Sequence, residues 1–187
     1  MSLRAIWSAP KARITGAVYL LYLIAVELAW VFVVSRPITC RLVLLASNIL
    51  YIIVARLFYV MFEPVNRSLS LDAALFCVGG SMIGVLHIFG FETYIRAIGF
   101  LAVFSLLIGY LIVRSTFLPP FLGWLMVISG AGWVAFLNPS IAKYSHGHMS
   151  HFSFLVEGLL ALWLLVKGVD MERWREQCAV AEAISAK

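Results

Sequence analysis

Charged residues are scarce in this sequence. Only 12% of its 187 residues are Asp, Glu, Lys or Arg, and 63% are hydrophobic, whereas a soluble domain is about a quarter charged and about half apolar. The mean hydropathy is +1.00. A water-soluble fold of this composition would expose large hydrophobic patches, so the surplus apolar surface is expected to face lipid. The sequence therefore predicts an integral membrane protein whose main partner is the lipid bilayer.

Cysteines and common catalytic motifs are also sparse. The three cysteines, Cys40, Cys77 and Cys178, have no CxxC spacing, so neither a disulfide framework nor structural zinc is indicated. The chain has no G-x-x-x-x-G-K-[ST], H-E-x-x-H or G-x-S-x-G motif, and so lacks the usual signatures of nucleotide-driven enzymes and hydrolases. Its net charge of +5 comes from basic residues that stand singly between apolar segments, which does not indicate nucleic-acid binding. A non-enzymatic role is favoured, and catalysis is left open.

Six long apolar segments fill most of the chain. Each is close to the length that a helix needs to cross about 30 Å of hydrocarbon, and the absence of period-two alternation favours helices over barrel strands. We predict an all-α transmembrane bundle in a single domain, residues 1–187. The tail, residues 170–187, is expected to form a short cytoplasmic helix that caps the bundle, with Trp174 at the membrane interface. The predicted spans are residues 14–34, 42–62, 71–91, 97–113, 120–137 and 152–169.

The distribution of Lys and Arg predicts the orientation of these spans. Nine of the 14 basic residues fall on the side that holds both termini, four fall on the other side, and Arg56 lies within the second span. Because cytoplasmic loops carry the excess of Lys and Arg, both termini are predicted to be cytoplasmic. The expected location is the cytoplasmic (inner) membrane of a bacterium.

Four stretches of the sequence form recognisable motifs. They are RITGAVYLLYLI, EPVNRSLSL, GYLIVRSTFLPPFLGWLMVISGAGW and EGLLALWLLVKGVDMERW. Together these stretches resemble the bacterial family called domain of unknown function 4386, a set of small multi-pass membrane proteins. The chain departs from that pattern by being short between the first two helices and in the third-to-fourth region. The resemblance implies a membrane architecture and no particular activity.

Four polar residues are expected at a similar depth in the membrane. At about 1.5 Å per helical residue, Glu27, Asn48, His87 and Glu157 all lie roughly 6 to 10 Å from the extracytoplasmic ends of their spans. Polar groups in a span are expensive to bury and are candidates for function, with structural pairing as the alternative. Glu27 and Asn48 are expected to pair with each other. His87 follows two glycines at helical spacing, which favours an interhelical hydrogen bond.

Two further polar residues have structural explanations. Arg56 lies in the cytoplasmic third of the second span, where its long side chain can reach the interface or contact Tyr59, Glu63 or Tyr110. Asn66 and Ser68 are the candidates to cap the third helix.

Histidine is concentrated in one stretch, KYSHGHMSH, which is predicted to be the loop between the fifth and sixth spans. It holds His146, His148 and His151, and His87 is expected near the same membrane face. Imidazole nitrogens suit Zn or Cu, and Glu27 or Glu157 could add an oxygen ligand or orient a ring. Haem is disfavoured, because it would require His87 and His151 as facing axial ligands. The alternatives are a polar, solvated loop that binds no metal, a pH sensor and a contact with a partner.

Three functions remain open from the sequence. The favoured one is an accessory or structural subunit of a larger membrane complex, since the small spans and short loops leave little room for a substrate cavity. The second is a metal-binding membrane protein that uses the histidines. The third is a small proton-coupled transporter, in which Glu27, His87 and Glu157 would line a water-filled path.

Overall fold

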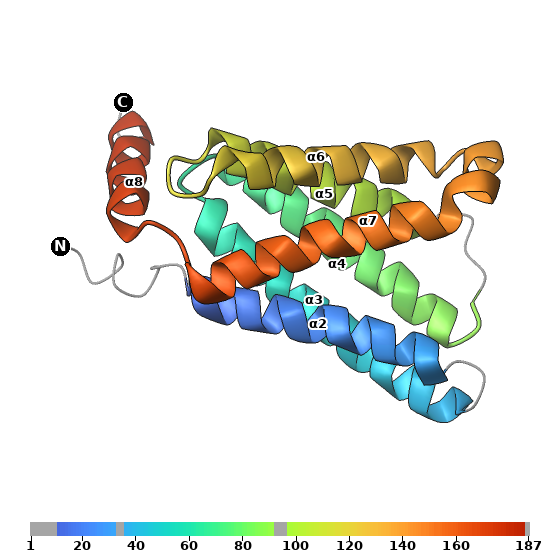
Figure 1. Ribbon diagram of the computed structural model, residues 1–187. Coiled ribbons are helices and arrows are strands. Elements are labelled where there is room, and N and C mark those ends of the chain that lie inside the picture. Colours follow the sequence, from blue (N-terminus) through green and yellow to red (C-terminus); the bar gives the residue numbers. More distant parts are fainter. Residues whose placement is uncertain (1–10, 33–35, 92–96, 186–187) are drawn as a thin grey trace.

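The computed structural model describes residues 11–32, 36–91 and 97–185, and within these ranges the chain forms seven helices (Figure 1). They are α2 (Ala12–Phe32), α3 (Pro37–Phe62), α4 (Arg67–Ile88), α5 (Ala97–Arg114), α6 (Pro120–Ala135), α7 (Pro139–Val166) and α8 (Met171–Ser185). The predicted all-α class is confirmed.

Five of the helices are long and apolar enough to cross a membrane, namely α2, α3, α4, α5 and α7. The sixth apolar helix, α6, has 16 residues and so spans about 24 Å at 1.5 Å per residue. It is shorter than the predicted segment 120–137 because the helix ends at Ala135. Membrane-spanning length is therefore clear for five helices, and α6 packs with them as a shorter apolar helix.

Helices α2, α3, α4 and α7 begin earlier than the apolar runs indicated, whereas α5 and α6 begin at the predicted residues 97 and 120. Helix α3 begins at Pro37, where a proline suits the first turn. Helix α4 begins at Arg67, because the side chain of Asn66 accepts a hydrogen bond from the backbone N–H of Leu69 at 3.0 Å. The cap predicted at Asn66 is thus confirmed. Capping groups set these starts, and the polar first turns that follow them carry no hydropathy signal.

The histidine-rich stretch is helical, and its prediction as a loop is wrong. Helix α7 begins at Pro139, thirteen residues before the start of the predicted sixth span at residue 152, so residues 146–151 lie within the helix. Asn138 caps it by accepting a hydrogen bond from the backbone N–H of Ser140 at 3.0 Å. Asn138 and Pro139 therefore provide the N-cap and the first residue of α7.

The six apolar helices close into a ring. Each packs against the next along the chain, and α7 packs against α2 to complete the circuit (Figure 1). Fully buried residues such as Tyr19, Phe58, Phe104, Ile108 and Leu160 fill the interior. Because consecutive helices run in opposite directions, the connections 63–66 and 115–119 lie at the same end of the bundle as α8. We call this end the terminal face and the opposite end the distal face.

Glycines set the closest approaches between helices. A Cβ added at Gly123 of α6 would lie 2.6 Å from the backbone oxygen of Gly109 in α5, and one added at Gly109 would lie 2.8 Å from the oxygen of Gly123. A Cβ at Gly16 of α2 would overlap the backbone of α7 at Leu165. The missing side chains let these helices pack backbone against backbone, as small residues commonly do in membranes.

Helix α8 lies across the terminal face and contacts the end of α3 and the connection 115–119. Gly168, with a φ of +73°, ends α7 in the left-handed conformation that glycine favours and turns the chain toward α8. The Trp174 indole N–H donates to the backbone oxygen of Met61 at 3.1 Å, and only 3% of Trp174 is exposed. Thr116 contacts Gln177 through a 3.2 Å hydrogen bond. Trp174 was expected at the membrane interface, but it is buried against the bundle.

Candidate functional site

A carboxyl group lies in the interior of the ring. Glu157 of α7 is 5% exposed, and the fully buried Tyr19 of α2 holds its hydroxyl group beside that carboxyl group. The two groups interact electrostatically, but Tyr19 makes no hydrogen bond of good geometry among the described residues. Contact with α2 therefore offsets only part of the cost of burying the polar carboxyl group.

Three tyrosine rings extend from this carboxyl group toward α3. The ring of Tyr19 lies 6.1 Å from that of Tyr22, and the Tyr22 ring stacks on Tyr51 at 4.4 Å with an interplanar angle of 14°. The Cys77 thiol of α4 donates to the backbone oxygen of Tyr51 at 3.5 Å. The rings and the thiol thus join α2, α3 and α4 at mid-bundle.

A half-open cavity of about 300 Å³ lies beside the tyrosines, in the half of the bundle nearer the distal face. Helices α2, α3, α4 and α5 contribute its walls. Two of its hydroxyl groups, those of Tyr51 and Ser81, are buried and have no hydrogen-bond partner among the residues that the structure describes. The lining residues are Tyr22, Val26, Leu44, Ser47, Asn48, Tyr51, Phe76, Cys77, Gly80, Ser81, Gly84, Ala97, Ile98 and Leu101.

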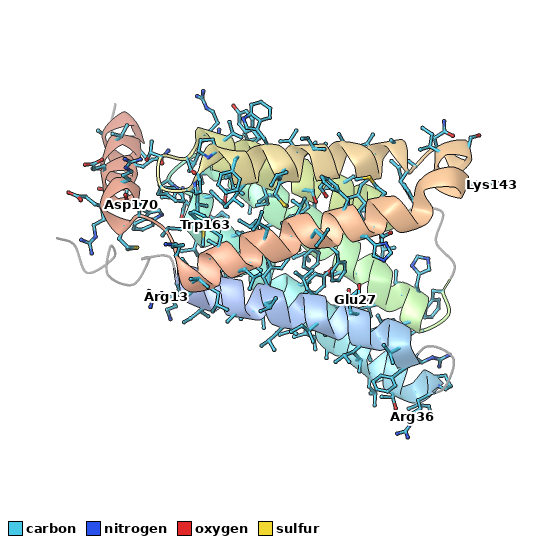
Figure 2. All side chains as sticks on the ribbon, in the orientation of Figure 1. Arg13, Glu27, Arg36, Lys143, Trp163 and Asp170 are labelled. Carbon is cyan, nitrogen blue, oxygen red and sulfur yellow. The ribbon has the colours of Figure 1, made fainter. Side chains whose placement is uncertain are left out.

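A second hollow, which we call the α2–α7 groove, lies on the outside of the ring. Its volume is about 350 Å³, and Glu27 is the ionisable residue in it. Figure 2 labels Glu27 on α2, on the side of the bundle where α2 and α7 run next to each other. Gly158 of α7 lies in the groove, and a Cβ added there would meet nothing within 4 Å. The other lining residues are Leu20, Leu23, Ile24, Leu28, Val31 and Phe154.

The polar residues that were expected at one depth do not share a site. Asn48 lines the cavity between α2 and α5, where its side-chain N–H donates to the backbone oxygen of Leu44 at 2.8 Å. Glu27 lies in the α2–α7 groove, so the structure does not bring the expected Glu27 and Asn48 pair together. His87 lies exposed near the distal end of α4, and Glu157 is buried in the ring.

Arg56 lies exposed on α3, with its guanidinium carbon 5.4 Å from the centre of the Tyr59 ring. This contact is one of those expected from the sequence, and it keeps the charge on the outside of the bundle.

The predicted histidine ligands are only partly described. The side chains of His146 and His148 lie outside the described residues, while His151 is exposed on α7. His151 and Glu157 are six residues apart on one helix, which is about 9 Å along its axis. Among the side chains that are described, no group of three or more His, Cys, Asp and Glu residues could hold a metal ion.

The sequence reading missed the tyrosines and Ser81. Tyr19 and Tyr22 are three residues apart and so share a helix face, which is a signal that could have been noticed. Ser81 carried no comparable signal, because a single serine in an apolar span is usually satisfied by its own helix.

Comparison with known proteins supports the architecture and gives no activity. Residues 85–168, from the end of α4 to the end of α7, match the family model for the domain of unknown function DUF4386. The predicted resemblance is thereby confirmed over that stretch. The chain is also 26% identical to an uncharacterized protein of Archaeoglobus fulgidus, in an alignment that covers 64% of this chain and 78% of the relative. No solved structure matches the chain.

Proposed function

We propose that this multi-pass membrane protein is a non-enzymatic accessory subunit of a larger membrane complex, and that a transmembrane helix of the partner binds in the α2–α7 groove. The observation that carries this proposal is a carboxyl group on the lipid-facing side of the bundle. Glu27 is exposed among Leu20, Leu28 and Val31, and it makes no hydrogen bond or ion pair with the described residues.

Lipid tails offer no partner for this carboxyl group. An acidic side chain at the centre of a membrane helix costs about 2.5 to 3.5 kcal/mol, and such residues usually face other protein groups. A partner helix that presents Lys, Arg or a hydroxyl group opposite Glu27 would offset that cost. The groove therefore favours a partner with one basic or hydrogen-bond-donating residue in an otherwise apolar span.

The shape of the groove suits a helix. Because Gly158 leaves open space above the α7 backbone, a second helix could approach closely there, and small residues are enriched at such contacts. Leu23, Leu28 and Val31 would supply the van der Waals contacts that drive helix association in lipid. Among the described residues that line the groove, Glu27 is the single ionisable one, which favours a role in partner recognition over catalysis.

Photo-cross-linking in native membranes tests this proposal. A photoreactive amino acid at Val31, which is 70% exposed in the groove, is expected to attach to one transmembrane helix that contains a basic or hydroxyl-bearing residue. The changes Glu27→Ala and Gly158→Leu should each lower the yield about tenfold, which corresponds to about 1.4 kcal/mol. The cross-linked peptide and its yield are measured by mass spectrometry.

A matched control uses the opposite surface. The same photoreactive residue at Leu75 of α4, which is also exposed, should give no protein adduct that depends on Glu27. Adducts at Val31 that go only to lipid or to a second copy of this chain, or yields that neither substitution changes, would contradict the proposal.

The orientation of the chain is a second element of this proposal. We propose that the terminal face lies in the cytoplasm, because exposed basic residues gather there. They are Lys11, Arg13, Arg67, Arg114, Lys167, Arg173 and Arg175. A fluorescent protein fused after Lys187 should fluoresce in cells, whereas alkaline phosphatase fused at the same point should be inactive. The reverse pair of results would overturn this orientation.

Metal binding and transport are less well supported by the geometry. A Zn or Cu site, with haem again disfavoured, stays a prediction that depends on His146 and His148, whose side chains are not described. A proton path through Glu27, His87 and Glu157 would have to connect an outer groove, an exposed helix end and a buried interior. Metal analysis of the purified protein tests the first of these, since about one Zn or Cu per chain would restore it.

A further inference from the structure

We infer that the cavity between α2, α3, α4 and α5 is a binding site for a small uncharged molecule with a planar apolar body and one or two hydroxyl or carbonyl groups. This site is separate from the α2–α7 groove, so the inference does not depend on the proposed partner. Its volume of about 300 Å³ lies at the lower end of the range for ligand pockets, about 300 to 1,000 Å³.

Unpartnered polar groups are the main argument for a ligand. The hydroxyl groups of Tyr51 and Ser81 belong to residues that are only 7% and 2% exposed, and neither makes a hydrogen bond of good geometry with the described residues. The Cys77 thiol lies near the Tyr51 hydroxyl group, whereas Ser81 has no such neighbour among the described residues. Buried polar groups in proteins are nearly always paired, so two unpaired hydroxyl groups in one cavity call for an explanation. A bound molecule that exchanges hydrogen bonds with them would provide it.

A third polar group faces the same space. The side-chain N–H of Asn48 is engaged with the backbone oxygen of Leu44 at 2.8 Å, which leaves its carbonyl oxygen free to accept. That oxygen lies 3.0 Å from the position a Cβ would take at Gly84. Because residue 84 is glycine, the space in front of the Asn48 oxygen remains open to a ligand.

The remaining walls determine the rest of the ligand. The stacked rings of Tyr22 and Tyr51, with Phe76 near them, offer flat apolar surface, on which planar molecules pack well. Among the described residues that line the cavity there is no Asp, Glu, Lys, Arg or His. A charged ligand would lose its hydration without gaining a counter-charge there, so the site favours an uncharged one.

Binding of 1-naphthol to the full-length, detergent-solubilised protein tests the inference. This probe has a planar apolar body and one hydroxyl group. Saturable binding is expected, with naphthalene about tenfold weaker because it lacks the hydroxyl group. Naphthalene-1-sulfonate, which is charged, should show no saturable binding. Equilibrium dialysis against matched detergent without protein corrects for uptake into micelles.

Substitutions locate the binding. Ser81→Ala and Tyr51→Phe should each weaken 1-naphthol about five- to tenfold, since each removes one hydrogen bond. Ser81→Leu, which would fill the cavity, should abolish binding. The control is Ser105→Ala, because Ser105 of α5 is also a buried serine without a hydrogen-bond partner among the described residues but does not line the cavity.

Three results would overturn the inference. They are the absence of saturable 1-naphthol binding, equal affinity of the wild type and the Ser81→Ala protein, and binding of the sulfonate that matches that of 1-naphthol. Since Ser81→Leu could also disturb folding, its gel-filtration profile is compared with that of the wild type. If the two profiles differ, the result for Ser81→Ala is the deciding one.

Discussion

Replacement of Gly123 by valine is expected to unfold the bundle at a much lower temperature than the wild type. The new Cβ would lie 2.6 Å from the backbone oxygen of Gly109 and 2.8 Å from the backbone nitrogen of Val113. Backbone atoms cannot rotate away as a flexible side chain can, so α5 and α6 must separate along their contact. The expected loss exceeds about 3 kcal/mol, above the usual cost of overpacking. Thermal unfolding of the detergent-solubilised protein measures it.

Gly158→Ala is the matched control for this substitution. Gly158 also lies inside an apolar helix, but its added Cβ would meet nothing within 4 Å. Its effect should stay within about 1 kcal/mol and be stabilising, because alanine has the higher helix propensity. Equal melting temperatures for Gly123→Val and Gly158→Ala would show that α5 and α6 do not pack as closely as described.

Replacement of Trp174 by alanine is expected to release α8 from the terminal face. The ring is buried against the bundle, and its N–H donates to Met61. Removal of a buried aromatic side chain costs about 3 to 5 kcal/mol. Helix α8 has 15 residues and few other contacts with the bundle, so this loss is expected to exceed the remaining free energy of docking. Trp174→Phe, which keeps most of the ring volume and loses the hydrogen bond, should cost only about 1 kcal/mol.

Alkylation of Cys178 reports this release. Burial, followed by the charges of Glu182 and Glu63, raises the pKa of the Cys178 thiol from 9.0 to about 11. Thiolate is therefore rare at pH 8, and a maleimide should label Cys178 slowly while α8 is docked. In Trp174→Ala the pKa should fall toward its ordinary value and labelling should accelerate at least tenfold. Peptide mass mapping distinguishes Cys178 from the buried Cys40 and Cys77.

The same pKa shift gives the docking of α8 a dependence on pH. In the docked state the Cys178 thiol stays protonated at pH values above the pKa of the free thiol. The contribution of this thiol to docking is therefore fully present below about pH 9. It is lost as the pH rises from 9.0 to about 11. Labelling that is equally fast in the wild type and Trp174→Ala, at pH 8, would contradict the described position of α8.

The sequence predicted which parts of the chain are helical better than where the helices begin. The apolar segments predicted α2 to α6, because both the lipid-facing and the core-facing residues of a membrane helix are apolar and both contribute to its hydropathy. Asn66 was identified as a cap because its side chain acts within its own turn. The start of α7 was missed because residues 139–151 are polar, and polarity by itself does not separate a loop from a helix that extends beyond the apolar region.

The sequence by itself determined that this protein is an all-helical membrane bundle, and it identified Glu27, Asn48, His87 and Glu157 as polar residues within its apolar segments, because hydropathy depends only on the order of residues. Only the tertiary structure decided which of these residues face the interior, the cavity or the groove. Shared depth leaves the rotation of each helix undetermined. That rotation follows from packing, and the close contact at Gly16 sets it for α2 and α7, which carry Glu27 and Glu157.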